Sequence, residues 1–153
     1  MPQVEQSIDI QAPPAVVFAL VADQPERMPE WWPSFELQER VTPPPTRIGS
    51  ISRYVYNMMG IRIKGQHQVL QMDALDGHQR LVVKTISGLD SMFEFEFALS
   101  GSGTRLTVRI AYALPGSVLG QLLNRLTIEQ QNEQDLFESL KRLKSLVESE
   151  ART

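Results

Sequence analysis

The chain has 153 residues, of which 42% are hydrophobic and 22% charged, a composition typical of a globular protein of ordinary domain size. Its net charge of −3 and its lack of any run of Lys or Arg exclude the basic face that nucleic-acid binding requires, and give no support for attraction to an anionic membrane. It contains no cysteine, which excludes disulfides, thiolate nucleophiles and cysteine-based metal sites.

Neither a membrane span nor a secretory signal is expected. The longest apolar run, residues 15–22, is far short of the roughly 20 residues that a membrane helix needs. The first eleven residues carry Glu5 and Asp9 and have no apolar stretch. The sequence also shows no internal repeat and no convincing linker. We therefore expect residues 1–153 to form one cytoplasmic domain without integral membrane association.

The N-terminal part predicts one strand and two short helices. Residues 3–11 alternate between apolar and polar side chains, which is typical of a half-buried strand. Pro13 and Pro14 suit the first turn of a helix, which is expected over residues 15–22. Asp23 followed by Glu26 has capping-box spacing and predicts the start of a second helix, which Pro29 keeps short.

From Phe35 to Leu114 nearly every signal indicates a strand or a turn. Strands are expected over residues 35–41, 50–58, 61–69, 78–86, 93–99 and 106–114. Turns are expected at Met59-Gly60, at Asp76-Gly77 and over residues 101–103. Because successive connections are short, these strands predict an antiparallel meander.

The C-terminal part predicts one long helix. Pro115-Gly116 breaks the last strand, and residues 117 to about 149 have helical periodicity. Between two apolar stretches the predicted stripe falls on polar residues, and burying such residues without partners is costly. Either these residues border the wet mouth of a cavity or the helix bends there. A third alternative is two shorter helices with a break near Thr127. The stripe comprises Leu119, Leu122, Leu123 and Leu126, then the polar Glu129, Gln130 and Glu133, then Leu136, Phe137, Leu140, Leu143 and Val147.

This order of elements predicts an α+β fold. A curved antiparallel sheet of six to seven strands must cover its apolar face, and the last helix offers the only large apolar helical surface. A single helix touches a curved sheet along one line and leaves space beside it. We therefore expect an internal cavity that takes an apolar small-molecule ligand.

Several segments resemble the START-like superfamily, also called SRPBCC. Residues 10–18 (IQAPPAVVF), followed by Val21-Ala22-Asp23 and Trp32-Pro33, are similar to its opening. Residues 114–117 (LPGS), ahead of a helix that contains residues 140–144 (LKRLK), are similar to its ending. Residues 17–23 look closest to the polyketide cyclase/dehydratase and coenzyme Q-binding branches. The resemblance implies a helix-grip fold and a bulky apolar ligand such as a lipid, a quinone or a polyketide.

His67 is the only histidine on a strand face predicted to point inward. It is either a proton-transfer group or carbonyl-binding group, or a satisfied histidine at a strand end. In an enzyme, Tyr54 or Tyr56 would orient the substrate oxygen. Glu129 and Glu133 share a helix face and are either paired carboxylates or solvated ones. The candidate ligand-binding residues are Trp32, Tyr54, Tyr56, Met58, Ile63, His67, Phe93, Phe95, Tyr112, Leu126, Gln130 and Glu133.

Three functions stay open at this point. The first is a module that binds, transports or presents an apolar ligand. The second is a cyclase or dehydratase that uses His67, and the third is a protein-interaction module. The sequence contains no metal-binding motif, phosphate loop or dinucleotide fingerprint, so neither a metal nor a cofactor is expected. Nothing in the sequence points to an oligomeric state.

Overall fold

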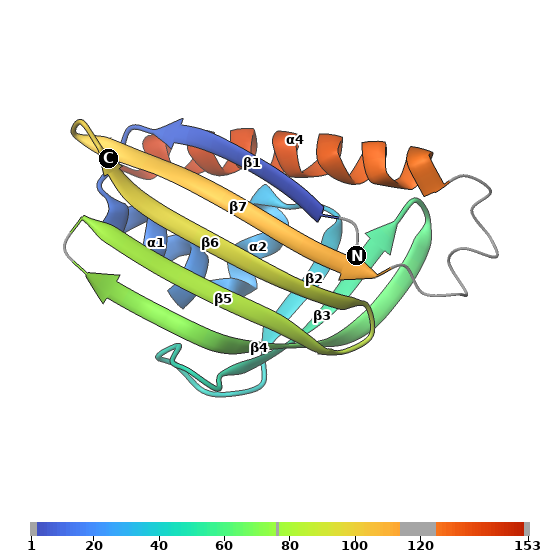
Figure 1. The fold of residues 1–153 in the computed structure, drawn as a ribbon. Helices are drawn as coiled ribbons and strands as arrows, with labels where there is room; N and C mark the ends of the chain where they lie inside the picture. The colour runs from blue at the N-terminus through green and yellow to red at the C-terminus, as the bar shows by residue number, and fades with distance from the viewer. Residues whose placement is uncertain (1–2, 76, 114–124, 152–153) are drawn as a thin grey trace.

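A computed structural model describes residues 3–75, 77–113 and 125–151, whose strands form one curled antiparallel sheet (Figure 1). The strand order is β1-β7-β6-β5-β4-β3-β2. The strands are β1 (Gln3–Ile10), β2 (Phe35–Arg40), β3 (Ile51–Met58), β4 (Ile61–Leu75), β5 (His78–Ser87), β6 (Asp90–Ser100) and β7 (Gly103–Ala113). The helical segments are α1 (Pro14–Asp23), η1 (Pro25–Arg27), α2 (Met28–Trp31) and α4 (Arg125–Ala151). The predicted α+β helix-grip architecture is confirmed.

Alternating side chains explain why β6 and β7 each bury one face. Phe93, Phe95 and Phe97 are buried on one face of β6, and the register pairs Phe95 with Val108 of β7. At the β3–β4 turn, Met59 and Gly60 have φ angles of 52° and 93°, the left-handed values that a two-residue type I′ hairpin requires. The meander runs from β2 to β7, and β1 returns to pair with β7.

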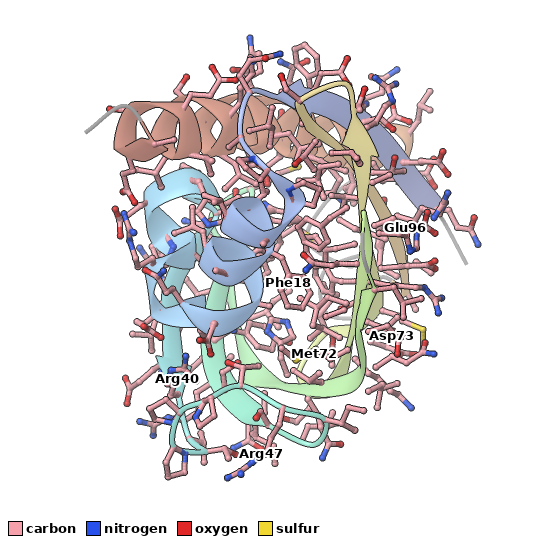
Figure 2. All side chains as sticks on the ribbon, turned by 90° about the vertical axis from the view of Figure 1, so that its left-hand side faces the viewer. Phe18, Arg40, Arg47, Met72, Asp73 and Glu96 are labelled. Carbon is pink, nitrogen blue, oxygen red and sulfur yellow. The ribbon has the colours of Figure 1, made fainter. Side chains whose placement is uncertain are left out.

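The helices cover one face of the sheet (Figure 2). Phe18 of α1 and Met72 of β4 point into the interior, whereas Asp73 and Glu96 lie on the outer face of the sheet. Phe18 meets Phe97 edge to face, with ring centroids 5.3 Å apart. The buried side chains of sheet and helices belong to one hydrophobic core.

Strand β4 is longer than predicted, because it continues past residue 69 to Leu75. A register shift between Val69 and Gln71 interrupts the alternation on which the prediction rested. Beyond this bulge the strand resumes in the opposite phase, with Met72 packed against the core. The predicted turn residue Asp76 lies outside the described residues.

The predicted capping box at Asp23 is wrong, although the second short helical segment exists as η1 and α2. Asp23 is the last residue of α1, and its carboxylate accepts a hydrogen bond from the Thr46 backbone N–H (3.0 Å). Glu26 instead pairs with Arg40 of β2 at 3.0 Å. Contacts with β2 and with the loop that follows it therefore replace the local cap.

Helix α4 runs without interruption from Arg125 to Ala151. The alternative of two shorter helices that meet near Thr127 concerns the residues before Arg125, which lie outside the described residues. Its buried face comprises Ile128, Leu136, Leu140, Leu143 and Val147. The polar interval in this face is occupied by Asn132 and Asp135, whereas Gln130 and Glu133 are exposed. The prediction had the wrong phase because it extended the stripe from Leu126, which is itself 59% exposed. Residues 114–124, including the predicted break at Pro115 and the first leucines, lie outside the described residues.

Candidate ligand-binding site

Two small cavities interrupt the packed interior. The first has a volume of about 60 Å³ and lies among α1, η1, α2 and strands β2 to β6. The second has a volume of about 40 Å³ and lies among strands β1 to β4, β6 and β7, Trp32, and Asn132 of α4. His67 and Phe93 line both cavities, so these two side chains form a partition between them.

His67 is held in this partition by aromatic packing. Its ring stacks on Tyr54, with centroids 4.3 Å apart and planes 13° from parallel. Phe35 and Phe93 meet the imidazole edge to face, at centroid distances of 5.6 Å and 5.5 Å. The side chain is consequently only 4% exposed.

Burial keeps His67 neutral, and the contact with Gln38 is linked to its tautomer. Desolvation lowers the pKa of the imidazole to about 3, so the ring is neutral at physiological pH. Its Nδ1 lies 3.2 Å from Gln38 Nε2. With the amide nitrogen as the donor in this contact, Nδ1 accepts and the imidazole proton is on Nε2. Among the described residues no group hydrogen-bonds this Nε2.

Gln38 reaches the interior because of an irregularity in β2. The register with β3 shifts between Phe35 and Leu37, so Leu37 is 40% exposed and Gln38 is buried. The Gln38 amide nitrogen also donates to Ser52 Oγ at 2.7 Å. One bulge thus places a polar side chain against His67.

Tyr54 is fixed by the backbone around its hydroxyl. Its Oη donates to the Ser87 carbonyl (3.1 Å) and accepts from the Leu89 N–H (2.9 Å). Glycines make this approach possible, since a Cβ at Gly65 would overlap the Ser87 carbonyl and lie 2.7 Å from the tyrosine hydroxyl. Desolvation raises the pKa of the Tyr54 phenol, so it stays protonated.

A second polar cluster joins α4 to the rest of the fold through Asp135. Its carboxylate accepts hydrogen bonds from Trp32 Nε1 (3.1 Å), Ser34 Oγ (2.9 Å) and Tyr56 Oη (3.4 Å). Burial, and then the negative charge of Asp135, raise the pKa of Tyr56, which keeps the phenol protonated as a donor. We call these four residues the Asp135 cluster.

The Asp135 cluster also borders a surface hollow of about 300 Å³ between β3 and α4. Tyr56, Met58 and Asn132 line both this hollow and the second cavity. Three side chains therefore stand between the exterior and the interior at this point.

The structure brings eight of the twelve predicted ligand-binding residues to the cavities. Ile63 is half-buried and packs against the core without lining either cavity. Leu126, Gln130 and Glu133 are exposed on α4 and line neither cavity. Phe95 lines the first cavity, His67 and Phe93 line both, and the second is also lined by Trp32, Tyr54, Tyr56, Met58 and Tyr112.

Sequence reasoning missed Trp31, Gln38, Asn132 and Asp135. Counting back from Leu140 in helical steps through Leu136 would have placed Asn132 on the buried face, with Asp135 beside it. For Gln38 the alternation pointed the wrong way, because the bulge in β2 has no sequence signature. Among the described residues, no three His, Asp or Glu side chains are grouped as metal ligands, and no helix is long and apolar enough to span a membrane.

Comparison with known proteins settles the family. The family described as "Polyketide cyclase / dehydrase and lipid transport" matches residues 1–148. The chain belongs to this family. Its members share a helix-grip fold suited to hydrophobic ligands, in agreement with the START-like resemblance of the sequence. No curated protein matches the chain significantly.

Solved structures share the family fold at low sequence identity. The protein TTHA0849 of Thermus thermophilus is 23% identical, with a TM-score of 0.76 over 95% of this chain and 97% of that one. A START superfamily protein from Mycobacterium smegmatis is 17% identical, with a TM-score of 0.73 over 96% and 97%. Major latex-like protein 151 of Panax ginseng is 15% identical, with a TM-score of 0.67 over 94% and 95%.

Proposed function

We propose that this family member binds a bulky apolar small molecule, such as a lipid, a quinone or a polyketide, in its interior. The observation that carries the proposal is the partition formed by His67 and Phe93. Because only these two of the described side chains are shared by the two cavities, moving them would join the cavities into one binding site. Their apolar walls suit the body of such a ligand, which the protein would transport or present.

Binding then requires the interior to open. Cavities of about 60 and 40 Å³ are far below the roughly 300–1,000 Å³ of a typical ligand pocket. Rotation of Phe93 and His67 would join the two spaces, and displacement at Tyr56, Met58 and Asn132 would connect them to the surface hollow. The ligand would stabilise this opened state by its preferential affinity for it.

Catalysis is the second candidate, favoured by the cyclase and dehydrase activities in the family description. The groups expected to perform it are poorly suited. With a pKa of about 3, His67 is a weak base and carries no acidic proton at neutral pH. The hydroxyls of Tyr54 and Tyr56 already bond to Ser87 and Asp135. Binding is therefore the function that this geometry supports best.

Apolar probes are expected to raise the melting temperature. At a concentration 100 times its Kd, a ligand stabilises the folded state by about 2.7 kcal/mol, which corresponds to roughly 5–10 °C for a domain of this size. Differential scanning fluorimetry with oleic acid, menadione and an anthraquinone would measure the shift. Mass spectrometry of the recovered probes would separate binding from turnover. A melting temperature that none of the probes changes would contradict the proposal.

Hydrogen exchange is expected to be faster in the first half of α4 than in the second. Between residues 126 and 135 only Ile128 is a buried apolar side chain, whereas Leu136, Leu140, Leu143 and Val147 anchor the second half. Segments with few buried apolar contacts open at lower free energy. Exchange measured by mass spectrometry should therefore be faster over 127–134 than over 136–147. Uniform protection would show that the ligand enters elsewhere.

A further inference from the structure

Two residues that line the first cavity, Trp31 and Gln38, each carry a buried polar atom without a hydrogen-bond partner. Trp31, 1% exposed, has an indole Nε1–H without an acceptor, and Gln38, 6% exposed, has a side-chain Oε1 without a donor. His67, in the partition, adds an Nε2–H with no hydrogen bond to any described residue. Side chains that carry two donors and one acceptor thus line a space that is otherwise largely apolar.

Buried polar groups are nearly always hydrogen-bonded, because leaving one unpaired costs free energy. The neighbouring polar groups obey this rule. Trp32 Nε1 is bonded to Asp135, and the Tyr54 hydroxyl is bonded on both sides. Trp31 and Gln38, which line the first cavity, differ in this respect from Trp32 and Tyr54, which line the second. Atoms left unpaired where a ligand would lie are the ones available to recognise it.

The charge around the first cavity indicates a neutral ligand group. Arg40 is a cationic residue of its wall, but its guanidinium bonds to Glu26 (3.0 Å), to Thr46 Oγ1 (3.0 Å) and to the Asp23 carbonyl. A ligand carboxylate would find this cation already engaged. It would also face the unpaired Gln38 oxygen, which repels an anion.

We propose that the first cavity is a recognition site for the oxygenated end of a neutral apolar ligand, one that carries both a carbonyl and a hydroxyl group. This inference rests on the proposed function and names the chemistry of the ligand. The carbonyl oxygen accepts from Trp31 Nε1–H. The hydroxyl donates to Gln38 Oε1 and can accept from His67 Nε2–H.

The hydroxyl suits this site because it can donate and accept. Turning the Gln38 amide over would exchange its nitrogen and oxygen and would move the His67 proton to Nδ1, so the two residues change roles together. A hydroxyl satisfies either arrangement. Trp31 remains a donor in both, and the ligand carbonyl is therefore the constant part of the recognition.

Three probes of one bicyclic skeleton test the proposal: tetralin, 1-tetralone and 4-hydroxy-1-tetralone. Each gained hydrogen bond should tighten binding roughly two- to tenfold, so affinity should rise in that order. In a proton–nitrogen correlation spectrum, the indole N–H of Trp31 should move downfield with 1-tetralone but not with tetralin. The Trp32 indole, already bonded to Asp135, serves as the internal reference.

Matched variants assign the preference to these atoms. Trp31→Phe should abolish the preference for 1-tetralone over tetralin. Gln38→Leu should abolish the additional affinity for 4-hydroxy-1-tetralone over 1-tetralone. Gln79→Leu is the control, because Gln79 Oε1 is also buried and unpartnered but lines neither cavity. This variant should keep both preferences. The indole shift in the wild-type protein is an independent readout that needs no variant to fold.

The outcomes distinguish a failure of the recognition site from a failure of apolar-ligand binding itself. Equal affinities for the three probes, with an unmoved Trp31 indole, would overturn the recognition site and leave apolar binding intact. Water alone would then satisfy Trp31 and Gln38. Absence of binding by all three probes would overturn both the site and the proposed function.

Discussion

Asp135→Ala is expected to lower the free energy of unfolding by about 3 kcal/mol, because hydrogen bonds to charged groups are worth roughly 1.5–3 kcal/mol each and buried donors left unpaired add to the cost. The substitution removes the shared acceptor of Trp32, Ser34 and Tyr56. Trp32 and Tyr56 are themselves buried, so water replaces the carboxylate poorly. Urea denaturation followed by tryptophan fluorescence would measure the change.

Glu133→Ala is the matched control for this prediction. Glu133 lies on the same helix but is exposed, so its removal should change stability by less than about 0.5 kcal/mol. Asp135→Asn keeps one acceptor oxygen and should lose an intermediate amount. Equal stabilities of Asp135→Ala and Glu133→Ala would show that the Asp135 cluster does not hold α4 against the rest of the fold.

Acidification is expected to destabilise the protein through His67. The folded-state pKa of this residue is about 3, whereas an exposed histidine ordinarily has a pKa of 6.5. As pH falls below 6.5, the imidazole of His67 becomes protonated in the unfolded chain but stays neutral in the folded chain. The stabilising contribution of neutral His67 is thus complete above pH 6.5 and is lost progressively toward pH 3. At about 1.4 kcal/mol per pH unit, the loss between about pH 7 and about pH 4.5 should be about 2–3 kcal/mol.

The variant His67→Gln isolates this contribution, because its amide occupies a similar place and does not titrate. The surface carboxylates paired with arginine titrate in both proteins and cancel in the comparison. Denaturation at a series of pH values should therefore show that the wild-type protein loses about 2–3 kcal/mol more than the variant. Parallel stability curves would mean that water reaches the imidazole and that the partition is open in the free protein.

Local alternation and periodicity determined most of the architecture. Phe93, Phe95 and Phe97 alternate with polar residues in β6, so only one face of that strand can be buried. The spacing of Leu136, Leu140, Leu143 and Val147 likewise predicted the buried stripe of the last helix. Such patterns depend on neighbours a few residues apart, and a single sequence contains them completely. The order of these elements predicted an α+β fold with a curved sheet around the last helix, and the resemblance to the START-like superfamily implied the helix-grip fold.

The chemistry of the candidate site depended on interactions that only the tertiary structure decides. A bulge in β2 turned Gln38 inward, and the packing of α4 against the rest of the fold brought Asp135 within 3.1 Å of the Trp32 indole. Which polar atoms remain unpaired, as in Trp31 and Gln38, depends on partners far apart in the chain. The same holds for the pKa of His67, which burial among rings from three other strands lowers. Sequence patterns report the face on which a residue lies, whereas pairing and desolvation arise only when distant segments meet.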